Sequence, residues 1–101
     1  MKKSFYQTGR RDANEGAIKE YLCEKSIPFI SLLPGQGADL VVLLNGCALF
    51  VEVKNPDTSK VRKELTDTEK EMLRLCVTRN IPYQVVFSVF DLQEAVKVFS
   101  K

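Results

Sequence analysis

The amino-acid sequence predicts a single α/β domain with the element order α-β-β-β-α-β-α, folded as a three-layer sandwich around a mixed central sheet. The chain has 101 residues, which suits one compact domain. Two apolar, β-rich runs flank Asn45-Gly46, and this pattern predicts an antiparallel hairpin. Both faces of these runs are apolar apart from a few charged positions, so helices should cover the sheet on both sides. A helix at 66–80 is long enough to act as a crossover between parallel strands.

The remaining elements follow from periodicity and from chain breakers. Residues 1–10 are polar and basic, and we expect them to form an N-terminal arm that precedes the domain at 11–101. Ile18 and Leu22 share one face of the first helix with Glu15. The expected helices are 12–25, 66–80 and one that follows a cap at Asp91 to Glu94, and the expected strands are 29–33, 38–44, 47–54 and 83–89.

Two features of the connections can also be predicted. A two-residue hairpin loop in a type I′ turn needs positive φ at both Asn45 and Gly46. The segments Ser26-Ile-Pro-Phe and Asn80-Ile-Pro-Tyr are similar, which indicates one kind of helix-to-strand connection used twice.

Composition narrows the possible functions. The chain has no histidine, which excludes histidine-based catalysis and most transition-metal sites. Three widely spaced cysteines do not form a disulfide framework or a structural zinc site. Neither a membrane-spanning run nor the apolar core of a signal peptide is present, so a cytoplasmic protein is expected. The net charge of +2 is too small to indicate a nucleic-acid partner by itself.

Basic residues nevertheless form two local clusters. They are candidates for contacts with nucleic-acid phosphates, and the alternative is an ordinary solvated surface. The clusters are Lys2, Lys3, Arg10 and Arg11 near the start of the chain, and Lys60, Arg62 and Lys63 in its middle.

The predicted hairpin places three charged residues together. With Leu44 opposite Cys47, the numbers of paired residues sum to 91, so Asp39 should lie opposite Glu52 on the same face of the sheet. Lys54 projects from that face two residues farther along. Two opposed carboxylates repel each other, and burial increases the cost, so a shared proton or a bound cation is expected to offset the repulsion. The alternative is a surface salt bridge among the three at a sheet edge.

The available ligands favour Mg²⁺ or Mn²⁺, because all of them are hard oxygen atoms. Lys54 beside the ion would position a water molecule or neutralise charge on a phosphate. Glu15 is directed toward the sheet and would support the site directly or through water. The alternative for Glu15 is a structural role, since Asp12-x-x-Glu15 is itself a capping-box pattern.

These residues resemble a known group of enzymes. Gly37-Ala38-Asp39 followed by Glu52-Val53-Lys54 across a hairpin, with Glu15 in the first helix, is similar to the PD-(D/E)XK nuclease superfamily. Within it, residues 10–100 resemble the compact VRR-NUC branch. One departure is Glu69, in Leu65-Thr66-Asp67-Thr68-Glu69, where that branch has glutamine at the start of the following helix.

The resemblance implies a restriction-endonuclease-like fold and a Mg²⁺- or Mn²⁺-dependent DNA endonuclease. Asp39, Glu52 and the Val53 carbonyl would hold the metal, with Glu15 in support, and Lys54 would complete the catalytic set. Small stand-alone members of this branch resemble junction-resolving enzymes of phage or mobile-element origin, which implies branched or four-way DNA as substrate. A phage-encoded enzyme would act in the cytoplasm of the host cell. The alternatives are an enzyme of the same fold that cuts linear DNA or nicks at a sequence, and a non-catalytic DNA-binding module.

Paired cuts in a junction require two active sites, so we expect a homodimer. Phe87, Val89 and Phe90 are the candidate interface residues. The alternative for these three is packing under the final helix.

Overall fold

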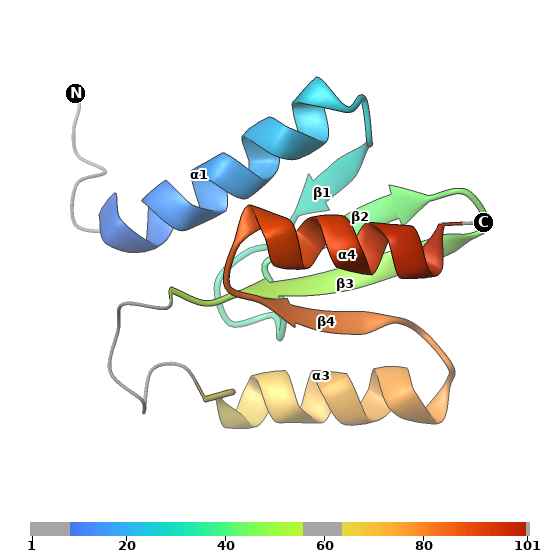
Figure 1. Cartoon of the computed structure of the whole chain (residues 1–101). Helices are drawn as coiled ribbons and strands as arrows, with labels where there is room; N and C mark the ends of the chain where they lie inside the picture. Colours follow the sequence, from blue (N-terminus) through green and yellow to red (C-terminus); the bar gives the residue numbers. More distant parts are fainter. Residues whose placement is uncertain (1–8, 56–63, 101) are drawn as a thin grey trace.

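Four strands form the centre of the fold. The computed structural model describes residues 9–55 and 64–100 (Figure 1). The elements are α1 (Gly9–Glu24), β1 (Phe29–Ser31), β2 (Leu40–Leu44), β3 (Cys47–Val53), α3 (Asp67–Thr78), β4 (Tyr83–Val86) and α4 (Val89–Phe99). Their order is the predicted one, so the α/β class is confirmed. α1 begins three residues ahead of the predicted start, and residues 1–8 of the expected arm lie outside the described part of the chain.

The sheet has the strand order β1-β2-β3-β4 and is mixed, as predicted. The β1–β2 and β2–β3 pairs are antiparallel, whereas β3 and β4 are parallel and are joined through α3. All five pairs between β2 and β3, from Leu44↔Cys47 to Leu40↔Val51, follow the predicted sum of 91. The hairpin register is therefore confirmed along the whole paired segment.

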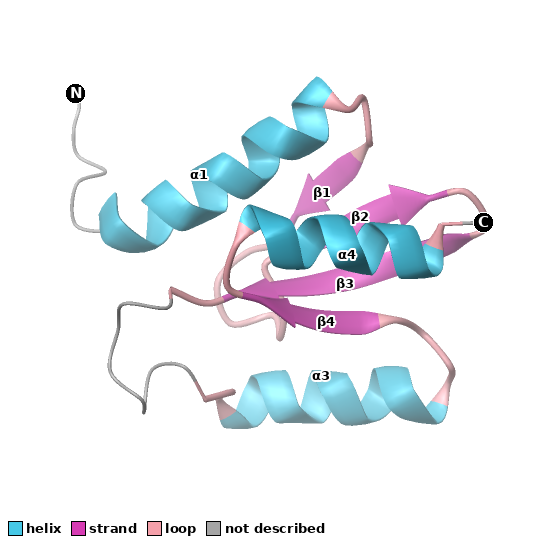
Figure 2. Ribbon diagram, viewed as in Figure 1, coloured by secondary structure: helices cyan, strands magenta, loops and turns pink. Residues whose placement is uncertain are grey.

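Helices pack on both faces of this sheet (Figure 2). On one face, Ile18 and Leu22 from α1 and Leu92 and Ala95 from α4 join the buried cluster formed by alternate strand residues. The strand members of the cluster are Leu40, Val42, Leu49, Val51, Val53 and Val86. Each leucine that is fully buried in this way stabilises the fold by roughly 1.5–3 kcal/mol. Because strand side chains alternate, Glu52 lies on the opposite face, which is the face that α3 approaches.

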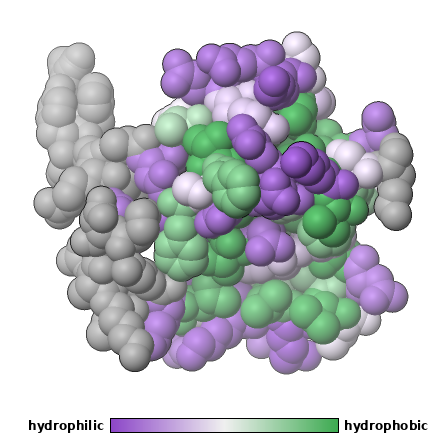
Figure 3. Space-filling view, in the orientation of Figure 1, coloured by the Kyte–Doolittle hydropathy of each residue, from purple (hydrophilic) through white to green (hydrophobic). Residues whose placement is uncertain are grey.

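The surface agrees with this layering. In Figure 3 the outer surfaces of α1 and α3 are mainly hydrophilic, and apolar residues gather between them. Within the described ranges 9–55 and 64–100, no helix combines the length and the apolar character that crossing a membrane requires.

Two predictions about chain turns and caps are wrong. Gly46 has a φ of +87°, but Asn45 is not among the described residues with positive φ, so the hairpin turn is not type I′. Glycine alone supplies the left-handed conformation here, and the register is unaffected.

The N-cap of α4 is Ser88 rather than Asp91: the Asp91 N–H donates to Ser88 Oγ over 3.2 Å, and Asp91 Oδ2 accepts from the Phe87 N–H over 2.9 Å.

The repeated helix-to-strand connection is confirmed. Ser26 and Asn80 have φ values of 58° and 57°. In each connection the following isoleucine donates its N–H to a helix carbonyl five residues earlier, Ile27 to Leu22 over 2.9 Å and Ile81 to Cys76 over 2.8 Å. The left-handed residue thus closes the helix and directs the chain into the next strand.

Candidate active site

Asp39, directly before β2, and Glu52, in β3, lie at one end of the β2–β3 hairpin. Asp39 lies one residue beyond the last pair, Leu40↔Val51, and its N–H donates to the Val51 carbonyl over 2.9 Å. The two residues are 8% and 3% exposed, respectively. β3 lies between β2 and β4, so these carboxylates are not at a sheet edge, and the interpretation as a surface salt bridge is wrong.

Backbone and tyrosine contacts fix the position of Asp39. Its Oδ2 accepts a hydrogen bond from the buried Val53 N–H over 2.8 Å, and its carbonyl accepts from the Leu32 N–H over 2.9 Å. Two residues earlier, the Gly37 carbonyl accepts from the Tyr83 hydroxyl over 2.6 Å. Burial, together with the nearby carboxylates Glu52 and Glu69, raises the pKa of Tyr83 above its ordinary value, so the hydroxyl keeps its proton.

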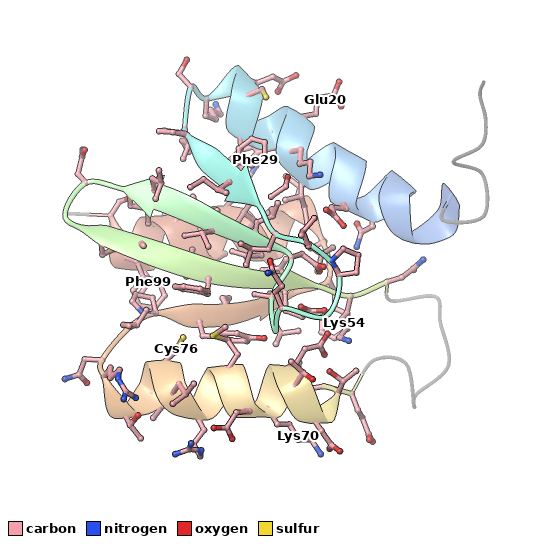
Figure 4. The ribbon with its side chains drawn as sticks, turned by 180° about the vertical axis from the view of Figure 1, so that it is seen from behind. Glu20, Phe29, Lys54, Lys70, Cys76 and Phe99 are labelled. Carbon is pink, nitrogen blue, oxygen red and sulfur yellow. The ribbon has the colours of Figure 1, made fainter. Side chains whose placement is uncertain are left out.

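Lys54 lies directly after β3 and is shared by two carboxylates. Its Nζ is 3.5 Å from Glu52 Oε2 and 3.0 Å from Glu69 Oε1, and its side chain is 11% exposed. Figure 4 shows Lys54 between the end of β3 and the first turn of α3. The predicted proximity of Glu52 and Lys54 is therefore confirmed.

Glu69 is not among the predicted site residues, although its position is one of those on which the resemblance to the VRR-NUC branch rests. The Thr66–Glu69 capping box identified it as the third residue of α3, and the structure confirms that box. No sequence signal indicated that its carboxylate would also reach Lys54, because that contact depends on how α3 docks beside the sheet.

The electrostatics of the group centre on Glu52. Burial, a hydrogen bond to Glu69 and the negative charges of Asp39 and Glu69 together raise the pKa of this carboxyl from 4.5 to about 9, against the opposing effect of Lys54. Burial also acts to raise the pKa of Glu69. The hydrogen bonds that Glu69 accepts from the Glu52 carboxyl, the Thr66 N–H and the Lys54 ammonium together lower it. Without a cation, Glu52 therefore carries a proton at neutral pH.

Helix α1 meets the same end of the sheet through Asn14. Its Nδ2 donates to the Lys54 carbonyl over 2.9 Å and to the Phe87 carbonyl over 3.3 Å, so one side chain joins α1 to the ends of β3 and β4. Glu15 forms an ion pair with Lys19 on its own helix at 3.1 Å. Since α1 begins at Gly9, Asp12 lies inside the helix, and the capping-box alternative for Glu15 is wrong.

The residues fit a divalent cation with an incomplete protein shell. With Glu52 ionised, three carboxylates and one lysine leave a local charge of −2, which one such ion would neutralise. Hard oxygen donors of this kind suit an ion that keeps several waters. Among the described residues, no three His, Cys, Asp or Glu side chains are grouped closely enough to hold one ion, so neither Glu15 nor Glu69 completes a ready-made set with Asp39 and Glu52. At Val53, the N–H makes the contact with Asp39, and a role for its carbonyl stays a prediction.

Two of the seven basic residues proposed for DNA contact lie in the described part of the chain. Arg10 and Arg11 belong to the first turn of α1. The others, Lys2, Lys3, Lys60, Arg62 and Lys63, lie outside the described residues.

Comparison with known proteins adds no assignment. No family model, no curated protein and no solved structure matches this chain.

Proposed function

We propose that this chain is a Mg²⁺- or Mn²⁺-dependent endonuclease that hydrolyses phosphodiester bonds in DNA. The observation that supports the proposal most is the burial of Asp39 and Glu52 side by side, with the Lys54 ammonium 3.5 Å from Glu52. A binding module needs no buried, mutually repelling carboxylates, whereas metal-assisted phosphoryl transfer uses such a pair.

Each residue has a role in this proposal. Asp39 and Glu52 would hold the ion, which when bound supplies charge neutralisation and acidifies a water molecule. The Val53 N–H keeps the Asp39 carboxylate oriented toward the end of the hairpin. Lys54 is placed to orient the attacking water and to stabilise negative charge on the phosphate. Glu15 and the Val53 carbonyl remain proposed supporting ligands.

The favoured substrate is branched DNA, such as a four-way junction. This part of the proposal rests on the resemblance of Asp39, Glu52-Val53-Lys54 and Glu15 to the VRR-NUC branch of the PD-(D/E)XK nucleases. The same resemblance supports action in a cytoplasm, including that of a phage-infected host. Two subunits would make the paired cuts that resolution of a junction requires.

A cleavage assay tests the proposal. Four-way, nicked and linear DNA are incubated with the protein in Mg²⁺, Mn²⁺, Ca²⁺ or EDTA. Mg²⁺ and Mn²⁺ should support cleavage, and Ca²⁺ should bind but support little turnover because its looser geometry positions water poorly. Asp39→Asn and Glu52→Gln should lose nearly all activity, and Lys54→Ala should lower kcat about 10²–10³-fold while still binding Mn²⁺.

The matched control is Glu71→Gln, which removes an exposed charge whose partner is Arg74 and should leave cleavage unchanged. Full activity in excess EDTA would contradict metal dependence. Binding to junction DNA with no cleavage under any condition would identify a non-catalytic module. Equal rates on all three DNAs would remove the branched-substrate assignment and leave a nuclease for linear DNA.

A further inference from the structure

Glu69 takes part in two interactions that belong to different parts of the fold. Its Oε1 accepts from the Thr66 N–H over 2.9 Å, and the Glu69 N–H donates to Thr66 Oγ1 over 3.2 Å, which completes the capping box. The same Oε1 also accepts from Lys54 Nζ over 3.0 Å. A capping box requires only the first two bonds. The bond to Lys54 is therefore an addition that connects the start of α3 with the end of β3.

The Lys54 ammonium has Glu69 as its nearer carboxylate partner, at 3.0 Å. Its other ion-pair partner, Glu52, is farther away, at 3.5 Å. A lysine side chain is long and flexible, so its ammonium stays at one position in a site only when contacts hold it there. The Glu69 side chain is 15% exposed, so its ion pair with Lys54 is shielded from solvent more than a surface pair would be.

We propose that Glu69 is a positioning residue that holds the Lys54 ammonium beside Glu52, so that the first turn of α3 belongs to the active site. The catalytic consequence rests on the proposed nuclease function. The geometric claim does not depend on it, because it concerns only where the ammonium lies. If Glu69 served the helix cap alone, a neutral glutamine at this position would serve equally well.

Two variants separate these roles. Glu69→Gln keeps an oxygen for the Thr66 N–H but removes the negative charge that faces Lys54. Thr66→Ala removes the side-chain cap of the Glu69 N–H but keeps the Glu69 charge. Glu71→Gln, on the same helix and with an exposed partner in Arg74, controls for loss of one negative charge.

The first readout is the chemical reactivity of Lys54 in the folded protein. A water-soluble acylating reagent labels amines, and mass spectrometry of peptides gives the rate at Lys54, with exposed Lys97 as an internal reference. Glu69→Gln should raise the labelling rate of Lys54 several-fold, because the ammonium loses its closer ion-pair partner. Thr66→Ala and Glu71→Gln should leave that rate near the wild-type value, although Thr66→Ala lowers the Tm.

The second readout is the steady-state kinetics of DNA cleavage. Glu69→Gln should lower kcat by roughly tenfold or more with little change in KM, and it should cause no further loss in a Lys54→Ala background, because both changes act through one group. Lys54 labelling in Glu69→Gln at the wild-type rate would overturn the positioning role. So would an equal rise in Thr66→Ala. If the wild-type protein cleaves no DNA, the proposed function fails, and the labelling rates still decide whether Glu69 positions Lys54.

Discussion

Glu52 is the residue whose state depends most on its surroundings. It is 3% exposed, and two further carboxylates, Asp39 and Glu69, act on it. In the unfolded chain, the Glu52 carboxyl has a pKa near 4.5 and loses its proton above about pH 4.5. In the folded, metal-free protein its pKa is about 9, so the carboxyl keeps the proton up to a much higher pH. The stability that this proton contributes is present below about pH 4.5 and is lost as the pH rises toward 9.

A pH series of thermal unfolding in EDTA should show this loss. We expect Tm to fall between about pH 5 and pH 9, and the lowered pKa of Glu69 should make Tm fall again in more acidic buffer, as that carboxylate is protonated. One kcal/mol corresponds to about 4–8 °C in a domain of this size. Glu52→Gln should remove the decline toward pH 9, since glutamine does not titrate. The exposed control Glu71→Gln should retain it. An unchanged slope in Glu52→Gln would contradict the assignment of the proton to Glu52.

The two carboxylates are not equivalent in their structural cost. The hairpin pattern alone suggests that removing either one relieves repulsion. Asp39, however, accepts the buried Val53 N–H, so Asp39→Ala would leave that donor without this acceptor, at a cost of about 1–3 kcal/mol. Asparagine keeps an oxygen for the bond, which is why Asp39→Asn is the appropriate variant for activity measurements.

At the scale of elements, the loop before β2 is held against α3. Gly37 has a φ of +92°, and a Cβ built there would lie 2.7 Å from Met72 Cβ. Gly35 has a similar φ of +83° but no neighbour within 4 Å of its Cβ position. These two glycines therefore separate the cost of a left-handed backbone from the cost of crowding α3.

Alanine substitutions at these glycines should differ measurably. Gly35→Ala should cost about 1–2 kcal/mol, which is the conformational term alone. Gly37→Ala should cost a further 1–3 kcal/mol or so, because Met72 must move, and it should also weaken Mn²⁺ binding, since Asp39 follows two residues later. Urea unfolding and metal titration provide the two measurements. Equal free energies of unfolding of the two variants would show that the close approach to Met72 adds nothing to the cost of the substitution.

The hairpin shows what could be predicted from the sequence. The two-residue loop fixed the pairing sum, and five observed pairs follow it, because side chains alternate strictly and a slip of one residue would expose the buried face. The turn type was wrong because a register requires only the loop length, which Gly46 can satisfy with its own positive φ. Local pattern likewise identified the Thr66–Glu69 capping box.

Contacts between distant elements could not be predicted in this way. Asn14 bonds to the Lys54 carbonyl, 40 residues away, and Glu69 bonds to the ammonium of the same residue, 15 residues away. Both contacts depend on the docking of a helix against the sheet, and periodicity specifies which face docks but not where along the sheet it lies. The contacts of the candidate site were therefore predicted within the hairpin and not where α1 and α3 dock against it.

At the scale of the whole molecule, the start of α4 lies at the end of the sheet that carries the site. Asn14 Nδ2 contacts both the Lys54 carbonyl and the Phe87 carbonyl, and α4 begins two residues after Phe87. Of the three residues proposed for a dimer interface, Val89 packs against the core and Phe87 is partly buried, whereas Phe90 is 64% exposed. An interface at Phe90 would therefore lie at the same end of the sheet as the candidate site.

The last prediction is that the protein is a homodimer with Phe90 at its interface. One site cuts one strand, and two-fold symmetry supplies the second cut without further parts. Phe90→Ser should raise the dimer dissociation constant about tenfold or more, because an exposed aromatic residue that becomes buried in an interface contributes strongly to affinity. Val77→Ser, which changes a residue of α3 with the same 64% exposure, should leave the constant unchanged. Analytical ultracentrifugation at micromolar concentration measures both dissociation constants.

A stable dimer unaffected by Phe90→Ser would exclude this residue from the interface. A wild-type monomer that stays monomeric on a four-way junction would contradict both the dimer and the paired-cut mechanism, because a single site at the β2–β3 hairpin would then have to make both cuts in turn.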